Sequence, residues 1–264
     1  MSQSTEYLAS LIKGNVSKRL LNLYFPREDG PSAGLLVTRL VAEEEISRDF
    51  CYTVTCVSDD PEIALKDVQC RMVCVELLRE DETSRWFNGY CHSFQRVDVN
   101  SHFAQYVMVL RPWLAYLRLR SDYWLFHNQT IEEQTKEVFC DLGLSSYDLR
   151  IRESDPPRTF SCQFDETDYN YLHRRWEEMG WHYCYEHTDS GHRLILSSTS
   201  TTCEPVDGEI TIAWHHDAGS NKHDKISHWQ PVRSVVSGKV GVSRFDFKKP
   251  VPARSGETSN HEHG

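Results

Sequence analysis

Residues 158–198 constrain the fold more than any other stretch, because their hydrophobic period changes from helical to strand-like within a few positions. Apolar side chains first recur at helical spacing, which predicts one buried helix face. These residues are Tyr169, Leu172, Trp176 and Met179. Gly180 predicts the end of the helix, since glycine takes the left-handed conformation that often closes one.

The period becomes two directly after Gly180, which predicts a strand. Aromatic residues at positions 181, 183 and 185 alternate there with polar ones. Residues 188–191 have the composition of a turn, so residues 192–198 can return antiparallel. Either Asp165 or Thr167 can cap the start of the helix, because each has a short side-chain oxygen that can accept a backbone N–H. Polar residues fill its other sides: His173, Arg174, Arg175, Glu177 and Glu178.

The first part of the chain has the pattern of short strands separated by polar turns. The expected strands are residues 20–25, 35–42, 50–58, 70–79, 85–97 and 103–110, with a short helical turn within 61–68. A series of this kind without long helices predicts an antiparallel barrel or sandwich.

The character changes after residue 112. Residues 113–126 are dense in aromatics and arginines and are compatible with a strand or irregular structure. Residues 130–143 predict a helix, because Thr130 and Glu133 form a capping box and Gly143 follows the last apolar position. The sequence Asp155-Pro156-Pro157 predicts a rigid break before the unit described first.

Strands are expected again after Pro205, over residues 209–214, 224–232 and 235–247. The last residues carry no apolar period and predict a flexible tail. The fold class is therefore β-rich α+β. The expected domains are a first β-barrel over 1–112, an α+β middle domain over 113–204, strands of a second β-barrel over 205–250 and a tail over 251–264.

Composition narrows the functional classes. The formal net charge is −10, whereas proteins that bind nucleic acids usually carry a basic surface patch. Nucleic acid is therefore not an expected partner. The N-terminus has no charged segment followed by an apolar one, so a signal peptide is not indicated, and the apolar runs are far shorter than the ~20 residues of a membrane span. The nine cysteines are scattered and odd in number, which favours buried reduced thiols in a cytosolic protein.

Two groups of carboxylates could in principle serve glycoside hydrolysis, Glu177 with Glu178 and Asp165 with Glu166. We favour a structural role, as a charged helix face and as acids that complement the helix dipole. The sequence contains no Gly-x-Ser-x-Gly, Walker or His-Glu-x-x-His motif. We therefore expect no catalytic residue.

Histidines cluster late in the chain, at 215, 216, 223 and 228, with Asp217 and Asp224 nearby. Their spacing fits no metal motif, and adjacent histidines in a strand point to opposite faces. His261 and His263 form a further His-x-His near the end. Cys70 and Cys74, if in one strand, lie about 13 Å apart, and Cys51 and Cys56 form no Cys-x-x-Cys pair. We expect no metal and no cofactor.

Five arginines lie close to aromatic residues in the sequence: Arg111, Arg118, Arg120, Arg174 and Arg175. A guanidinium can stack on an aromatic ring or form a bidentate pair with a carboxylate, within the chain or across a subunit interface. Simple surface solubility explains the same residues equally well.

Several segments resemble the spike proteins of type VI secretion, the valine-glycine repeat G (VgrG) family, whose hub fold is shared with contractile-phage baseplate hubs and the phage late-control D family. Residues 44–50 (EEISRDF) resemble its Glu-x-Leu-Ser-x-Pro-Phe segment, with Asp49 where the family often has proline. Residues 87–91 (FNGYC) resemble Phe-His-Gly-x-Val, and residues 110–114 match Leu-Arg-Pro-Trp-Leu. The order of acidic, aromatic and glycine residues within 162–187 also resembles the corresponding segment of that family.

The resemblance implies a structural protein without enzymatic activity. Hub proteins of that family form a homotrimer with two related barrels per chain, so that six barrels match the hexameric inner-tube protein (hemolysin co-regulated protein) while the other end leads into a threefold, membrane-puncturing needle. It further implies contacts with baseplate proteins, no nucleic acid and no stable membrane insertion by this region. The expected location is the bacterial cytoplasm before firing and the medium or target cell afterwards.

The family continues into needle domains, and this sequence stops at Gly264, about where they would begin. We therefore expect the chain alone to associate weakly. A contractile phage or prophage baseplate hub is an alternative that sequence separates poorly from a secretion spike. A hydrolase that uses Glu177, Glu178 or the histidines of 215–228 is a hypothesis of a different class.

Overall fold

The computed structural model describes residues 20–79, 82–99, 103–143, 146–200, 211, 213–214, 225–226, 228–235, 237–244 and 254–259. The chain divides into two compact units, residues 1–205 and 206–264, and each is described by itself.

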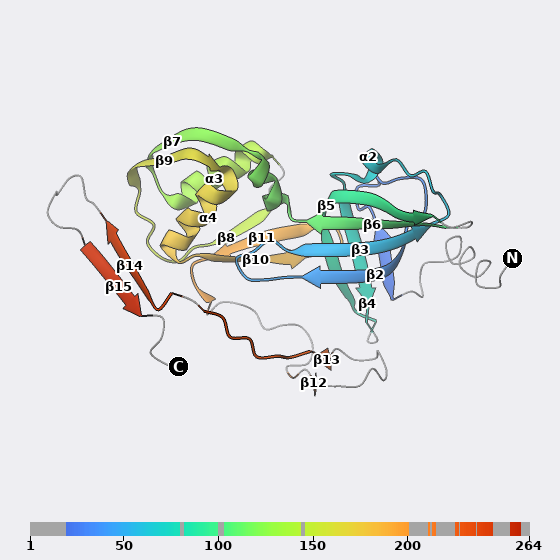
Figure 1. The fold of residues 1–264 in the computed structure, drawn as a ribbon. Helices are drawn as coiled ribbons and strands as arrows, with labels where there is room; N and C mark the ends of the chain where they lie inside the picture. The colour runs from blue at the N-terminus through green and yellow to red at the C-terminus, as the bar shows by residue number, and fades with distance from the viewer. Residues whose placement is uncertain are drawn as a thin grey trace. The chain divides into compact units, whose positions relative to one another are not determined.

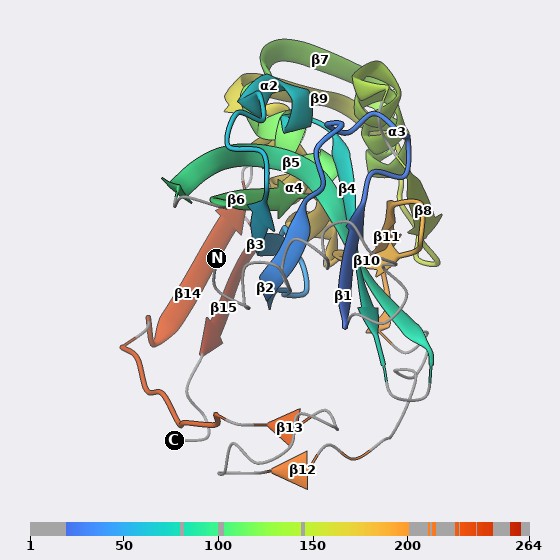
Figure 2. The same cartoon turned by 90° about the vertical axis from the view of Figure 1, so that its right-hand side faces the viewer.

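The first unit begins with a six-stranded antiparallel sheet, in the order β1-β4-β5-β6-β3-β2 (Figure 1). Its strands are β1 (Leu21–Tyr24), β2 (Leu36–Glu43), β3 (Cys51–Ser58), β4 (Met72–Leu78), β5 (Ser84–Val99) and β6 (Ala104–Arg111), with the short helix α2 (Leu65–Val68) between β3 and β4. The edge strands β1 and β2 contact each other, so the sheet curls like a half-barrel (Figure 2). This confirms the predicted antiparallel, β-rich fold.

The alternating pattern of the strands produces the core of the sheet. In β3 the side chains of Tyr52, Val54 and Cys56 are fully buried, while their neighbours face outward. β6 alternates in the same way and buries Tyr106 and Met108 against them. Each such side chain contributes ~1.5–3 kcal/mol when removed from water, and the strictly alternating pattern fixes the register, since a slip of one residue would expose all of them.

An α+β lobe follows directly, in three layers. The sheet β7-β9 covers one side of the helices and the sheet β10-β11-β8 lies on the other (Figure 1). Its elements are the 3-10 helix η2 (Trp113–Leu119), β7 (Ser121–Gln129), α3 (Ile131–Leu142), β8 (Tyr147–Arg150), β9 (Arg158–Thr167), α4 (Asp168–Met179), β10 (His182–His187) and β11 (His192–Ser197). Aromatic side chains fill the middle, with Trp113, Trp176 and Phe139 almost fully buried.

Both predicted helices of the lobe are confirmed, with their caps. Thr130 accepts a hydrogen bond from the Glu133 backbone while the Glu133 side chain reaches back to the Thr130 backbone. The N-cap of α4 is Thr167, which decides between the two candidates; Asp165 instead has a left-handed backbone with a φ of 50°. Gly180 closes α4 in the left-handed conformation.

Two features of the lobe were not predicted. Residues 113–119 form a 3-10 helix, where a strand or irregular structure was expected; its buried residues are Trp113, Leu114, Ala115 and Leu117, which do not follow the alternation of a strand. β8 pairs parallel with β11, and a pairing between residues so distant in the chain leaves no local signal.

The described residues of the second unit form two strand pairs, β12 (Ala213–Trp214) with β13 (Lys225–Ile226) and β14 (Lys239–Arg244) with β15 (Arg254–Ser259). Where a strand was expected over residues 224–232, the structure has only the two residues of β13, and the described residues 228–235 are in no strand. Pro231 contributes to this, because proline has no backbone N–H to donate to a neighbouring strand. Residues 254–259, expected within a flexible tail, form β15 instead, since backbone hydrogen bonds to β14 need no apolar period. The second barrel and the domain limits stay predictions.

We expect Thr130→Ala to lower the free energy of unfolding by about 1 kcal/mol, because it removes the acceptor for the Glu133 backbone N–H at the start of α3. Thr130→Ser keeps the hydroxyl and should stay close to the parent chain. Urea unfolding followed by tryptophan fluorescence measures both. Equal losses for the two variants would contradict the role of the cap.

Candidate functional site at the junction of sheet and lobe

The loop between β2 and β3 joins the sheet to the α+β lobe. The Ser47 backbone N–H donates to the Tyr183 carbonyl of β10 at 2.9 Å, and the Tyr183 N–H donates back to Ser47 Oγ at 3.4 Å. Ser47 has a φ of 59°, an uncommon conformation for a residue other than glycine. The reciprocal bonds hold this strained turn against the lobe.

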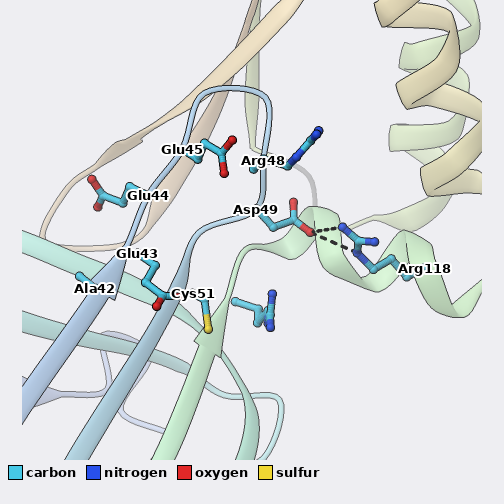
Figure 3. Close-up of a pocket in the computed structure, with 9 residues that line it drawn as sticks. Ala42, Glu43, Glu44, Glu45, Arg48, Asp49, Cys51 and Arg118 are labelled. Carbon is cyan, nitrogen blue, oxygen red and sulfur yellow. Dashed lines mark hydrogen bonds and ion pairs between the residues drawn. The ribbon is translucent and has the colours of Figure 1, made fainter. Parts of the chain in front are cut away.

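Asp49 lies at the centre of this junction. Its side chain is only 2% exposed, and its Oδ2 pairs with Arg118 Nη2 of η2 at 3.1 Å (Figure 3). Tyr185 of β10 donates its hydroxyl to Oδ1 at 3.2 Å, and the Arg118 guanidinium stacks 3.4 Å over the ring of Tyr169. Burial raises the pKa of Asp49, although Arg118 acts in the opposite direction. The Asp49 carboxylate therefore bonds directly to two elements of the lobe, η2 and β10, and Arg118 extends the contact to Tyr169 of α4.

An open groove of about 650 Å³ runs beside Asp49. Glu43, Glu44 and Glu45 line it (Figure 3), together with Arg48, Arg111 and Arg118. Glu44 is engaged by Arg85 and by the Tyr52 hydroxyl. Arg48 donates to the Ser47 carbonyl at 3.1 Å, and the charge of Arg111 favours the ionised form of Asp49.

Buried rings complete the junction around Phe50, which is 1% exposed. Phe50 stacks on Tyr52 and makes edge contacts with Tyr185, His187 and His192, at centroid distances of 4.5–5.1 Å. Gly89 leaves room for this ring, because a Cβ there would come within 2.9 Å of both Phe50 and a backbone carbonyl. Any larger residue at position 89 would displace the junction.

His192 is neutral in this environment. Its Nε2 accepts a hydrogen bond from the Trp113 backbone N–H at 3.1 Å, so this nitrogen carries no proton. Burial, assisted by the nearby His187, lowers the pKa of His192 to about 3. Burial likewise lowers the pKa of His187 to about 4, where its Nε2 lies 3.0 Å from the Tyr52 hydroxyl.

The three segments of the sequence that carry the family resemblance meet here. Phe50 ends the first, Gly89 lies in the second and Trp113 in the third. They contact one another through the Phe50 ring and through His192, which comes from β11. Asp49 itself was not singled out as functional; the signal that could have revealed it is an acid at a position where the family often has proline.

Two of the four candidate carboxylates, Glu178 and Glu166, form ion pairs. Glu178 pairs with Arg158 at 3.0 Å and with Arg175 at 3.1 Å. Partial burial opposes ionisation of Glu178, but these two arginines lower its pKa overall. Glu166 is held in the same way by Arg174. Such contacts are those of a charged surface, which favours the structural interpretation over acid–base catalysis.

The arginines near aromatic residues have both predicted kinds of contact within the chain. Arg174 and Arg175 lie over the ring of Tyr171, at 4.9 and 5.3 Å, and each also pairs with a glutamate. Arg120 pairs with the buried Asp168 at 3.0 Å and with Asp141. A role across a subunit interface stays a prediction.

The residues considered for metal binding are only partly within the described chain. His228 is exposed and lies 3.4 Å from Gln230. His215, His216, Asp217, His223, Asp224, His261 and His263 lie outside the described residues. Within the described part, no group of three or more potential ligands is arranged to hold a metal. Cys70 precedes β4 with a φ of 63°, so it does not share the strand of Cys74 as expected.

Comparison with known families decides the classification. Residues 43–264 match the model of the family described as phage tail baseplate hub (GPD). The chain belongs to this family. The match includes the junction loop, four of the six strands of the sheet and the lobe.

Similar proteins within the hub family include type VI secretion spike proteins. The chain is 28% identical to the spike protein VgrG1b of Pseudomonas aeruginosa over 85% of its length and 31% of that protein, and 28% identical to VgrG1a of the same organism over 84% and 34%. It is 26% identical to the actin cross-linking toxin VgrG1 of Vibrio cholerae over 76% and 18%. The chain thus spans about a third or less of the length of these relatives.

A solved structure shares the fold of this hub-family chain. It is the Escherichia coli c3393 protein, described as a component of the type VI secretion system similar to the T4 tail proteins gp27 and gp5. The TM-score is 0.62 at 17% identity, over 71% of this chain and 51% of that one. Among the described residues, no helix is long and apolar enough to cross a membrane.

We expect Arg118→Ala to lower the free energy of unfolding by about 1–3 kcal/mol at pH 7, because Asp49 would remain buried without its cation. The pKa of Asp49 is already raised by burial, so ionisation weakens the folded state as the pH increases through that pKa. The loss should therefore shrink in acid. Urea unfolding at pH 7 and pH 4 measures it.

Arg193→Ala is the matched control, because its pair with Glu186 is about half exposed on both sides and should contribute less than ~1 kcal/mol. If Arg118→Ala costs no more than Arg193→Ala, the Asp49 contact does not stabilise the junction.

We expect stability to decrease as the pH falls from 7 to 5, since the folded pKa of His192 lies near 3 and the unfolded one near 6.5. The stabilisation is complete above the unfolded pKa and is lost as the pH falls towards the folded pKa; for one fully buried histidine the loss at pH 5 is about 2 kcal/mol. His192→Gln, which can still accept from Trp113, should flatten this dependence. An unchanged slope would exclude His192 as a source.

Proposed function

We propose that this chain is the hub portion of a type VI secretion spike, the part that adapts the hexameric inner tube to a threefold needle. The observation that carries the proposal is the match of residues 43–264 to the baseplate hub family, together with the spike proteins among its relatives. The curled antiparallel sheet with an adjoining α+β lobe supports it, because a rigid curved sheet is suited to lining a ring.

The hub acts as a homotrimer in this proposal. Each copy contributes two related barrels, of which the six-stranded sheet is the first, so that three copies present six similar units to the hexameric tube. A threefold ring closes when one surface of each copy binds a different surface of the next. The role is mechanical: contraction of a sheath drives the tube and spike through a target membrane.

The proposal includes no enzymatic activity and no cofactor for this region. Two of the four carboxylates considered for catalysis, Glu166 and Glu178, are paired with arginines instead. The partners are further copies of the chain, the inner-tube protein and baseplate proteins, without nucleic acid, as the net charge of −10 favours. The protein is cytoplasmic before firing and leaves the cell with the spike.

A contractile phage or prophage tail hub is a second candidate, favoured by the description of the matching family as a phage tail component. Deletion of the gene distinguishes a secretion spike from a phage tail hub. Deletion in the source bacterium should abolish release of the inner-tube protein if the chain serves secretion. It should instead abolish tail particles after prophage induction if the chain serves a phage.

Native mass spectrometry of the chain mixed with the inner-tube protein of the same genome tests the adapter role. We expect complexes of three hub chains for each tube hexamer. Complexes with one or six hub chains, or no complex when both proteins are folded and concentrated, would contradict a symmetry adapter.

A further inference from the structure

The outer face of the sheet β7-β9 is apolar but uncovered. On its inner side Phe126 is 1% exposed and Gln163 fully buried against the helices. On its outer side four large side chains are 57–70% exposed, namely Tyr123, Leu125, Phe160 and Phe164. We call these four residues the aromatic face. Exposed apolar residues scattered singly are ordinary, but a contiguous group of this size marks a binding surface.

The backbone presents this face through an irregularity. Asp122 pairs with Glu166 and Trp124 with Gln163, so that Tyr123 alone stands opposite Phe164 and Asp165. Asp165 takes the left-handed conformation, with a φ of 50°. Such β-bulges re-aim side chains and are frequent at functional sites. Here the bulge places the rings of Tyr123 and Phe164 in edge contact at 5.2 Å.

The same bulge adds negative charge at one end of the aromatic face. The Tyr123 hydroxyl donates to Asp165 Oδ1 at 3.4 Å, and Asp122 is exposed beside it. Neither acid has an ion pair among the residues that the structure describes. The occupant of this face should therefore combine an apolar side chain with a cation.

The chain itself offers such a surface at the junction loop, residues 44–48. Ile46 at its tip is 69% exposed, and Arg48, two residues further on, is exposed without an ion pair in the described part of the chain. The loop also carries two acids, of which Glu44 pairs with Arg85 and Glu45 lines the groove beside Asp49. The bonds between Ser47 and Tyr183 hold the loop in place, so little conformational entropy is lost when it binds. Loop and aromatic face are different surfaces, which is the arrangement that a closed ring requires.

We propose that the aromatic face of one copy binds residues 44–48 of a second copy, with Ile46 against Tyr123 and Phe164 and Arg48 against Asp122 and Asp165. This inference rests on the proposed trimeric hub and specifies its subunit contact. Arg48 can also stack on the two exposed rings, since a guanidinium is attracted to an aromatic face.

Photo-crosslinking locates the contact. Tyr123 is replaced by benzoylphenylalanine, and equal amounts of chains with natural and heavy nitrogen are mixed at up to hundreds of micromolar. We expect crosslinks between heavy and light chains from position 123 to residues 44–48. Crosslinks only within one chain, or from position 123 to other residues of the second copy, overturn the proposal. If sedimentation shows trimers but the crosslinks from position 123 go to other residues, the proposed hub function is still supported and only this subunit contact is wrong.

Charge reversal tests the pairing of the two surfaces. We expect Arg48→Glu and Asp122→Lys each to weaken self-association at least about tenfold, and the chain with both changes to recover most of it. Arg39→Glu, the same change at another exposed arginine, is the control and should have little effect. The contact is excluded if Arg48→Glu, Asp122→Lys and the control change self-association equally. It is also excluded if the chain with both charge reversals does not regain self-association. Circular dichroism verifies that each variant is folded.

Discussion

The rest of the structure depends on the packing of Phe50 at the junction. This ring belongs to the sheet, but it is enclosed by Tyr185, His187 and His192 from the lobe. Its place exists only because position 89 is glycine. Around it, Asp49 with Arg118 and Ser47 with Tyr183 add directional bonds. Apolar burial supplies most of the free energy, and the polar bonds fix how the two parts meet.

Local features of the fold could be predicted from the sequence. The capping box of Thr130, the closing Gly180 and the alternation of residues 51–58 are each determined by a few neighbouring residues, and the structure confirms them. The pairing of β8 with β11 could not be predicted from the sequence, because it depends on residues far apart in the chain. β15 was missed for a related reason, since its partner supplies the order that its own composition lacks.

The candidate site shows the same division. The segments that contain Phe50, Gly89 and Trp113 could be selected from the sequence, but only the fold brings them together around His192. His173 was expected on the polar side of its helix, yet it lies partly buried, 2.9 Å from the Tyr183 hydroxyl, and burial lowers its pKa to about 4. A polar residue in a helical pattern does not reveal whether a neighbouring element will cover it.

A rigid junction and uncovered surfaces on either part suit a component whose task is to assemble. The large apolar side chains of the sheet and of the lobe are buried within the chain, while the aromatic face of β7-β9 and Ile46 of the junction loop are exposed on its surface. Electron cryomicroscopy of the chain assembled on the inner-tube protein tests this account most directly. The account predicts three copies in a ring whose curled sheets face the tube hexamer. A single copy, or a ring in which the curled sheets do not contact the tube, would contradict it.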